Sequence, residues 1–120
     1  MSKIFKIVDS PLELQRGATD GSQIYISNKL SENEKIATLA HEVAHNFLGH
    51  FKKDIERSFA ELEAESCSYM VTTLLGLDNQ KAALYINNWR NQRDSIPDEV
   101  KERSSLIIKT SQKIVELFMS

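Results

Sequence analysis

Two histidines and a glutamate stand close together in the segment His41-Glu42-Val43-Ala44-His45, which has the pattern HExxH. Residues four apart lie on one face of an α-helix, so in a helix both imidazoles can bind a single metal ion. Zinc accepts imidazole nitrogens and keeps one position for water in catalytic sites. Glu42, beside the first ligand, is then placed to take a proton from that water. The pattern predicts a metal centre on His41 and His45, with Glu42 as the general base.

A carboxylate from the following helix is expected to complete the ligand set. When each residue is stepped by about 100°, Glu65 falls on the buried arc of that helix with Leu62 and Tyr69. Glu63 points about 160° away from Glu65, toward solvent. A buried carboxylate needs a partner, and a metal ion is a good one. We therefore expect Glu65 to be the third ligand, with Glu61 at the edge of the arc as the alternative ligand or a supporting group.

The expected cofactor is zinc (Zn2+), because two imidazoles and one carboxylate suit this ion. The same ligand set also accepts Mn, Fe, Co or Ni. Residue types alone therefore leave the identity of the metal open.

The HExxH segment lies in a predicted helix that begins at a capping box, Ser31 to Glu34. Apolar residues continue at helical spacing as far as Phe47, and Gly49 is a natural end. The pattern thus places both histidines in the second half of one amphipathic helix. Three more helices are predicted, over about residues 53–75, from Asp78 to Trp89, and from Ser95 toward Phe118.

The first 30 residues differ from the rest, because they contain short β-branched segments. Ile4–Val8 and Gln23–Ser27 are predicted strands, and residues 19–22 form a turn signal that makes residues 12–18 a partner for the second strand. A small N-terminal antiparallel β-sheet followed by a helical core is an α+β pattern. Gln23–Ser27 is either an interior strand or an exposed edge that adds an extended substrate by main-chain hydrogen bonds.

The composition is that of a soluble globular protein of one domain, with 120 residues, 41% hydrophobic and 27% charged. A net charge of -2 gives no general electrostatic case for nucleic acid or for an anionic membrane. Cys67 is the single cysteine, so an internal disulfide is excluded and a reducing compartment fits. We find no signal peptide and no apolar run of about 20 residues, so we expect the cytoplasm and no membrane span.

A resemblance to known families rests on the same helix. The string His41-Glu42-x-x-His45-x-x-Leu48-x-His50 resembles the HExxHxxLxH motif of the ImmA/IrrE metallopeptidases. The resemblance implies a zincin-like fold, taken here as a single domain over residues 1–120, and a peptidase activity that depends on zinc. The string departs from these families at position 44, where alanine stands in place of a frequent glycine.

The following segment adds to the resemblance. Nineteen residues separate His45 from Glu65, the spacing found in gluzincins such as thermolysin. Residues 61–69, followed by Gly76-Leu77-Asp78, look like the zincin-like domain of ArdC-type antirestriction and mobile-element proteins. Cys67-Ser68 departs from the more apolar residues usual there. The similarity covers about residues 23–89.

Three more residues near the site have alternative interpretations. His50 matches a family position, but a histidine just after a helix also interacts well with the helix dipole and the free carbonyls. Tyr69 is either a hydrogen-bond donor to a ligand carboxylate or an oxyanion, or an aromatic residue of the core. Cys67 is expected to be a small buried residue, because no activating base lies near it.

These observations support one principal function and one alternative. The first is hydrolysis of a peptide bond in an intracellular protein or peptide by a zinc metallopeptidase. The alternative is a non-proteolytic, metal-binding zincin-like module of a mobile element, which binds single-stranded DNA or a host defence protein. Glu42 favours catalysis, since a structural metal site needs no general base. The sequence leaves the substrate and the oligomeric state open.

Overall fold

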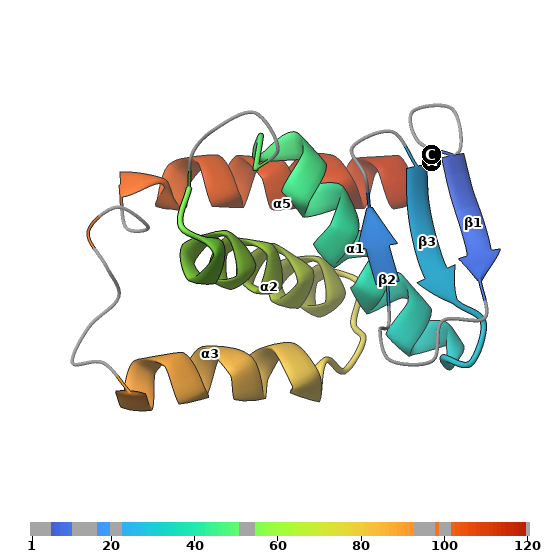
Figure 1. Ribbon diagram of the computed structural model, residues 1–120, viewed down its shortest axis with the longest axis horizontal. Coiled ribbons are helices and arrows are strands. Elements are labelled where there is room, and N and C mark those ends of the chain that lie inside the picture. The colour runs from blue at the N-terminus through green and yellow to red at the C-terminus, as the bar shows by residue number, and fades with distance from the viewer. Residues whose placement is uncertain are drawn as a thin grey trace.

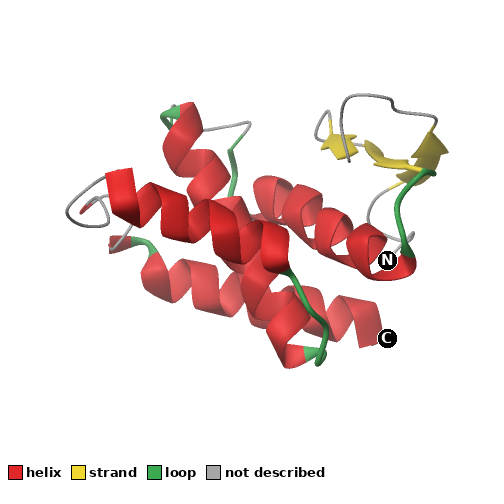
Figure 2. Ribbon diagram, turned by 90° about the horizontal axis from the view of Figure 1, so that it is seen from below, coloured by secondary structure: helices red, strands yellow, loops and turns green. Residues whose placement is uncertain are grey.

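The computed structural model describes residues 6–10, 17–19, 23–50, 55–92, 98 and 102–119. These residues form strands first and helices after, as predicted, and the core is helical. The strands lie together at one end of the molecule, beside α1 (Figures 1 and 2). The elements are β1 (Lys6–Ser10), β2 (Gly17–Thr19), β3 (Gln23–Ser27), α1 (Glu32–Phe47), α2 (Arg57–Leu74), α3 (Gln80–Gln92) and α5 (Ser104–Met119).

The sheet is mixed, whereas the sequence predicted an antiparallel one. β2 pairs antiparallel with β3 and overlaps the predicted partner, residues 12–18, at Gly17 and Ala18, but β1 pairs parallel with β3. The strand order is β1-β3-β2, so β3 is the interior strand and β2 lies at an edge. Ile24 and Ile26 of β3 are buried and alternate with the half-buried Gln23 and Tyr25, and Ser27 at the end of the strand is buried too. The strand with this apolar alternation takes the centre, where both of its edges are paired.

The two ends of α1 follow the signals in the sequence. The Ser31 hydroxyl accepts a hydrogen bond from the Glu34 amide, and the Glu34 carboxylate accepts one from the Ser31 amide, so the capping box is confirmed. At the other end Gly49 has a φ of 75°. The amide of Gly49 donates to the carbonyl of Asn46, and that of His50 donates to the carbonyl of His45. These two bonds form a Schellman motif, which turns His50 back toward the last turn of the helix.

α2 is central, because it packs against α1, α3 and α5. One of its faces points toward α1, where the Ser68 hydroxyl donates to the carbonyl of Ala37. A second face points toward α5, where Cys67 lies against the carbonyl of Ile107. The sequence analysis assumed that α2 has one buried arc and that a residue opposite that arc faces solvent. The second buried face explains why this assumption misplaced side chains of α2.

Two side chains of α2 are placed opposite to their prediction. Glu63 was expected in solvent, yet it is 1% exposed because α5 covers its side of the helix. Tyr69 was expected on the buried arc, yet it is 41% exposed, since it lies between the two covered faces. Glu65 is buried at 3% exposure, as predicted.

Some helix boundaries differ from the prediction or fall outside the described residues. α2 begins at Arg57, later than about residue 53, because Glu56 has an extended backbone with ψ at 134°. Of the predicted turn at residues 19–22, Thr19 is the last residue of β2 and the others lie outside the described residues, as does the predicted helix start at Ser95 and Pro97. Among the described helices, none has the length and apolar character needed to cross a bilayer.

Candidate metal centre

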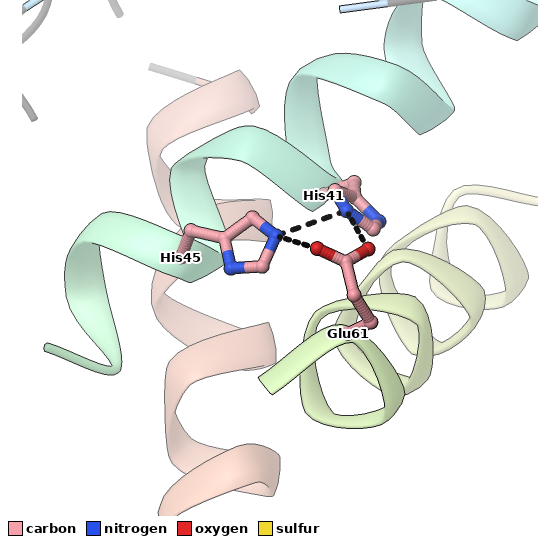
Figure 3. Close-up of side chains that lie close together, drawn as sticks. All are labelled: His41, His45 and Glu61. Carbon is pink, nitrogen blue, oxygen red and sulfur yellow. Dashed lines mark hydrogen bonds and ion pairs between the residues drawn. The ribbon is translucent and has the colours of Figure 1, made fainter. Parts of the chain in front are cut away.

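Three predicted site residues meet where α1 faces α2. The Nε2 atoms of His41 and His45 lie 3.1 Å apart. The Glu61 carboxylate straddles the pair, with Oε2 3.2 Å from His41 and Oε1 3.1 Å from His45 (Figure 3). One ligand atom from each of these residues lies within 4.8 Å of the others, which makes a His/His/Glu set able to hold a metal ion.

The spacing and charge of this set fit a divalent cation. Two ligands held tetrahedrally at about 2.0–2.1 Å from zinc are about 3.3 Å apart, close to the separation of the two nitrogens. Burial alone would lower the pKa of His41, but the nearby carboxylates of Glu61 and Glu65 outweigh it and raise this pKa to about 9. The contacts with His41 and His45 in turn hold the pKa of Glu61 below its usual range. The surroundings of the His41 imidazole therefore favour positive charge.

Glu65, the expected third ligand, lies on the far side of His41. Its Oε1 is 2.6 Å from Nδ1, while Nε2 is the nitrogen that faces His45 and Glu61. The contact is short but lies off the N–H direction, so Nδ1 makes no aligned hydrogen bond. Lys81 from α3 places its Nζ 3.1 Å from the same carboxylate oxygen. Burial raises the pKa of Glu65, but His41 and Lys81 outweigh it and lower the pKa overall.

His45 is supported by a longer series of contacts. Its Nδ1 lies 2.7 Å from Nδ1 of His50, whose Nε2 is 2.8 Å from Oε1 of Glu63. Arg103, which directly precedes α5, donates from Nε to the other oxygen of Glu63 at 2.6 Å. The His50 side chain is 4% exposed and the Glu63 side chain 1%, so the middle of this series is shielded from water. The Schellman motif that ends α1 is what brings His50 into reach.

Glu42 borders the same cleft as the three converging side chains. The cleft has a volume of about 930 Å³, and its lining includes His41, His45, Glu61 and Glu42. Glu42 is 8% exposed. Burial raises its pKa above the usual value, although the nearby histidines oppose the shift. A carboxyl group with a raised pKa is a stronger base, which is the property that proton transfer requires.

A scan against family models now adds an independent finding. Residues 4–72 match the peptidase M78 model, described as the IrrE N-terminal-like domain. The chain belongs to the IrrE N-terminal-like domain family. The match confirms the predicted ImmA/IrrE resemblance, and peptidase activity is the activity that this family suggests. The likeness to ArdC-type proteins stays a prediction. No curated protein and no solved structure matches the chain.

Several residues of this IrrE-like site were not identified from the sequence. Glu61 was only the alternative ligand, although it is one turn before Glu65 on the face toward α1. Lys81 and Arg103 carried no local signal, because they contact glutamates 16 and 40 residues away in the chain. Tyr69 was weighed as a hydrogen-bond donor, but it is not among the residues that line the cleft.

Proposed function

We propose that this protein is a zinc-dependent peptidase that hydrolyses a peptide bond in an intracellular protein. The observation that carries the proposal is the convergence of two imidazoles and two carboxylates, from two helices, on one cleft. The match to a peptidase family supports it. In this proposal the metal is held by His41, His45 and Glu61, and the whole of residues 1–120 acts as one domain.

Each residue around the cleft has a stated task in this proposal. Bound zinc supplies a Lewis acid, which polarises a carbonyl and makes water more acidic. Glu42 takes the proton of the attacking water and passes it to the departing amine. Glu65 orients His41 through Nδ1, so that Nε2 remains directed at the metal. A structural metal site would have no use for Glu42 in this position.

The proposed substrate is an extended segment of a protein. β2 lies at the edge of the sheet, and its Gly17 lines the cleft. An extended peptide adds to such an edge by main-chain hydrogen bonds. Gly17 has no side chain to keep it from α1: a Cβ there would lie 3.4 Å from Cγ of Glu42. A peptide beside β2 would therefore pass next to the general base. β3 is paired on both sides and does not offer such an edge.

The choice of Glu61 over Glu65 is tested by metal content. The measurement is elemental analysis after dialysis against a weak chelator, for wild type, Glu61→Ala and Glu65→Ala. We expect Glu61→Ala to lose the metal, and Glu65→Ala to retain it with weaker affinity. Loss of metal in Glu65→Ala alone would reverse the assignment of the third ligand.

The activity is tested with Glu42→Gln, which keeps the size of the side chain but cannot accept the proton. The assay follows cleavage of a mixture of unfolded proteins by mass spectrometry, with bound zinc measured in parallel. We expect Glu42→Gln to keep zinc and to lose about 10²–10⁴-fold in rate. Glu34→Gln is the matched control, because Glu34 lies on the same helix and lines the same cleft. It should cleave at nearly the wild-type rate.

The alternative function predicts a different result from the same preparation. If wild type binds zinc and cleaves nothing in the mixture, while it retains single-stranded DNA in a gel, the peptidase proposal fails. The non-proteolytic module would then account for the site. Cleavage that persists in Glu42→Gln would contradict the role of the base and leave the metal ligands unaffected.

A further inference from the structure

Two cationic side chains line the cleft, Arg57 and Lys81. Lys81 is already paired, because its Nζ lies 3.1 Å from the Glu65 carboxylate. Arg57 is exposed, and among the described residues no partner forms a hydrogen bond or an ion pair with its guanidinium. The cleft therefore contains one cation that is available to a ligand.

The carboxylates nearest to Arg57 in the chain are engaged elsewhere. Glu56 accepts a hydrogen bond from the Ser58 hydroxyl at 2.7 Å. Glu61 directs both of its oxygens at the two histidines of the metal centre (Figure 3). The first turn of α2 contains no acidic residue. Arg57 thus keeps an uncompensated positive charge at the wall of the cleft.

The position of Arg57 relative to the metal centre follows from the spacing along α2. Arg57, Glu61 and Glu65 stand four residues apart, so they lie on one face of the helix and one turn from each other. Lys81 pairs with Glu65 at one end of this row, and Arg57 is the other end. Four residues of helix rise by about 6 Å, which corresponds to about two residues of an extended chain. A substrate group that Arg57 binds would therefore lie within about two residues of the scissile bond, on one side of it.

The lining of the cleft indicates which kind of anion suits Arg57. Five carboxylates line the same cleft, those of Glu34, Glu42, Glu61, Glu65 and Asp78. They would repel a nucleic acid, which carries a negative charge at every phosphate. A peptide can present a single carboxylate to Arg57 and keep its other residues neutral. Arginine binds a carboxylate through two parallel N–H···O hydrogen bonds, so this pairing is also specific in geometry.

We infer that Arg57 is a specificity residue, which binds a carboxylate of the peptide substrate beside the scissile bond. The inference rests on the proposed function in taking the cleft as the place where a peptide binds and is cleaved. The carboxylate belongs to an aspartate or glutamate side chain or to the C-terminus of a short substrate. Both sources present the same two oxygens to the guanidinium, and the test below distinguishes them.

The first test measures peptide binding to the full-length, metal-free protein by fluorescence anisotropy, so the result depends on neither zinc nor activity. A short neutral peptide with a glutamate at its centre is compared with the same peptide carrying glutamine there, both amidated at the C-terminus. We expect wild type to bind the glutamate peptide about 5-fold more tightly, as one partly exposed charged pair provides. Arg57→Gln should bind the two peptides equally.

A third peptide identifies the source of the carboxylate. It carries glutamine at its centre and a free carboxylate at its C-terminus. Tighter binding of this peptide than of its amidated form, lost in Arg57→Gln, would assign the bound carboxylate to the chain terminus. Equal affinities of wild type for all three peptides would overturn the inference.

Reversal of the charge separates recognition from a structural role of Arg57. Arg57→Glu should bind a peptide with a central lysine more tightly than the glutamate peptide, and Arg57→Lys should keep the preference for glutamate. Lys81→Gln is the matched control, because Lys81 is the other cation of the cleft and already has a partner. It should keep the wild-type preference. Absence of reversal in Arg57→Glu, or loss of the preference in Lys81→Gln, would contradict the assignment to Arg57.

Cleavage by the zinc-loaded protein then separates this inference from the proposed function. With glutamate moved along the peptide, kcat/KM should be highest when it lies within about two residues of the scissile bond on one side, and Arg57→Gln should remove this preference. Cleavage without any preference would overturn the inference and leave the peptidase proposal standing. Peptide binding that depends on Arg57, without cleavage, would do the opposite. Retention of single-stranded DNA that Arg57→Gln abolishes, with equal affinities for the peptides, would assign Arg57 to nucleic acid and overturn the inference.

Discussion

The two histidines of the candidate metal centre sit one turn apart on α1, yet the protein supports them in different ways. His41 contacts a carboxylate directly, and Lys81 behind that carboxylate is 53% exposed. His45 contacts a second histidine, and the series ends at Arg103, which is 21% exposed. Glu65 and Lys81 of the first support both line the cleft, whereas in the second only His50 does, and Glu63 and Arg103 lie behind it, away from the cleft lining.

Because of this difference, loss of the two supports should affect different properties of the protein. An exposed lysine returns to water when its partner is removed, whereas a buried charge stays uncompensated. We therefore expect damage on the His45 side to weaken the fold first, and damage on the His41 side to weaken metal binding first. Variants that give the opposite order would remove the distinction between the two supports.

The largest effect is expected for Glu63→Ala. The substitution leaves Arg103 and His50 facing a cavity without their acceptor, and breaking a buried ion pair in this way costs about 3–5 kcal/mol. Urea denaturation of the metal-free protein gives the free energy of unfolding. Glu65→Ala is the matched control, with an expected loss of about 1 kcal/mol. Equal losses in the free energy of unfolding would show that Glu63 and Glu65 contribute equally to the stability of the fold.

Cys67 gives a second measure of the same change. Its thiol lies between α2 and α5, is 0% exposed, and has a pKa that burial raises to about 11. Iodoacetamide, which reacts with the thiolate, should therefore modify native wild type very slowly at neutral pH. We expect faster modification in Glu63→Ala, because α5 loses an anchor, and wild-type protection in Glu65→Ala.

The next effect is on metal affinity, where the order reverses. Glu65→Ala removes the carboxylate beside Nδ1 of His41. Loss of such a group typically weakens metal binding by about 10–100-fold. Dye competition with Zn²⁺ measures it. Lys81→Ala is the control, because it leaves that carboxylate in place. An equally large loss in Lys81→Ala would mean that charge balance, and not orientation of His41, is what Glu65 provides.

How much of this arrangement the sequence predicts depends on the range of each interaction. The capping box, the strands and the positions of His41 and His45 on one helical face follow from local rules, and they were predicted. The neighbours of α2 do not follow from its own periodicity, because a helix with two covered faces has no single polar side. The sequence therefore placed Glu63 in solvent, whereas Arg103, which directly precedes α5, contacts it and helps to bury it. The choice between Glu65 and Glu61 as third ligand stays a prediction.

Gly17→Ala tests the close packing of β2 against the side of α1 that borders the cleft. A Cβ at this position would lie 2.5 Å from Cγ2 of Thr38 and 3.4 Å from Cγ of Glu42. We expect a loss of about 2 kcal/mol in stability, because β2 must move away from α1. Thr38→Ser removes the nearest atom and leaves the Tyr25 carbonyl oxygen at 3.1 Å, so the double variant should recover part of the loss in a double-mutant cycle. Additive losses would show that the two positions do not clash.

The smallest effect is the most selective for the His45 side. Gly49 and Gly76 both have a φ of 75° and both end a helix with the same pair of amide-to-carbonyl bonds. Alanine at either position should cost about 1 kcal/mol of stability, because a Cβ is disfavoured in the left-handed region. The two variants should differ in zinc affinity, measured by dye competition.

Gly49 directly precedes His50, which contacts His45. Gly76 is not next to a residue of the metal centre, and a Cβ there would meet nothing within 4 Å. Strain at Gly49 therefore displaces the histidine that contacts His45, and strain at Gly76 does not. We expect weaker zinc binding in Gly49→Ala and wild-type binding in Gly76→Ala. Equal zinc affinities in the two variants would mean that His45 keeps its orientation without a correctly placed turn. The support of His45 would then not depend on the geometry of this turn, and in this respect it would not differ from the support of His41.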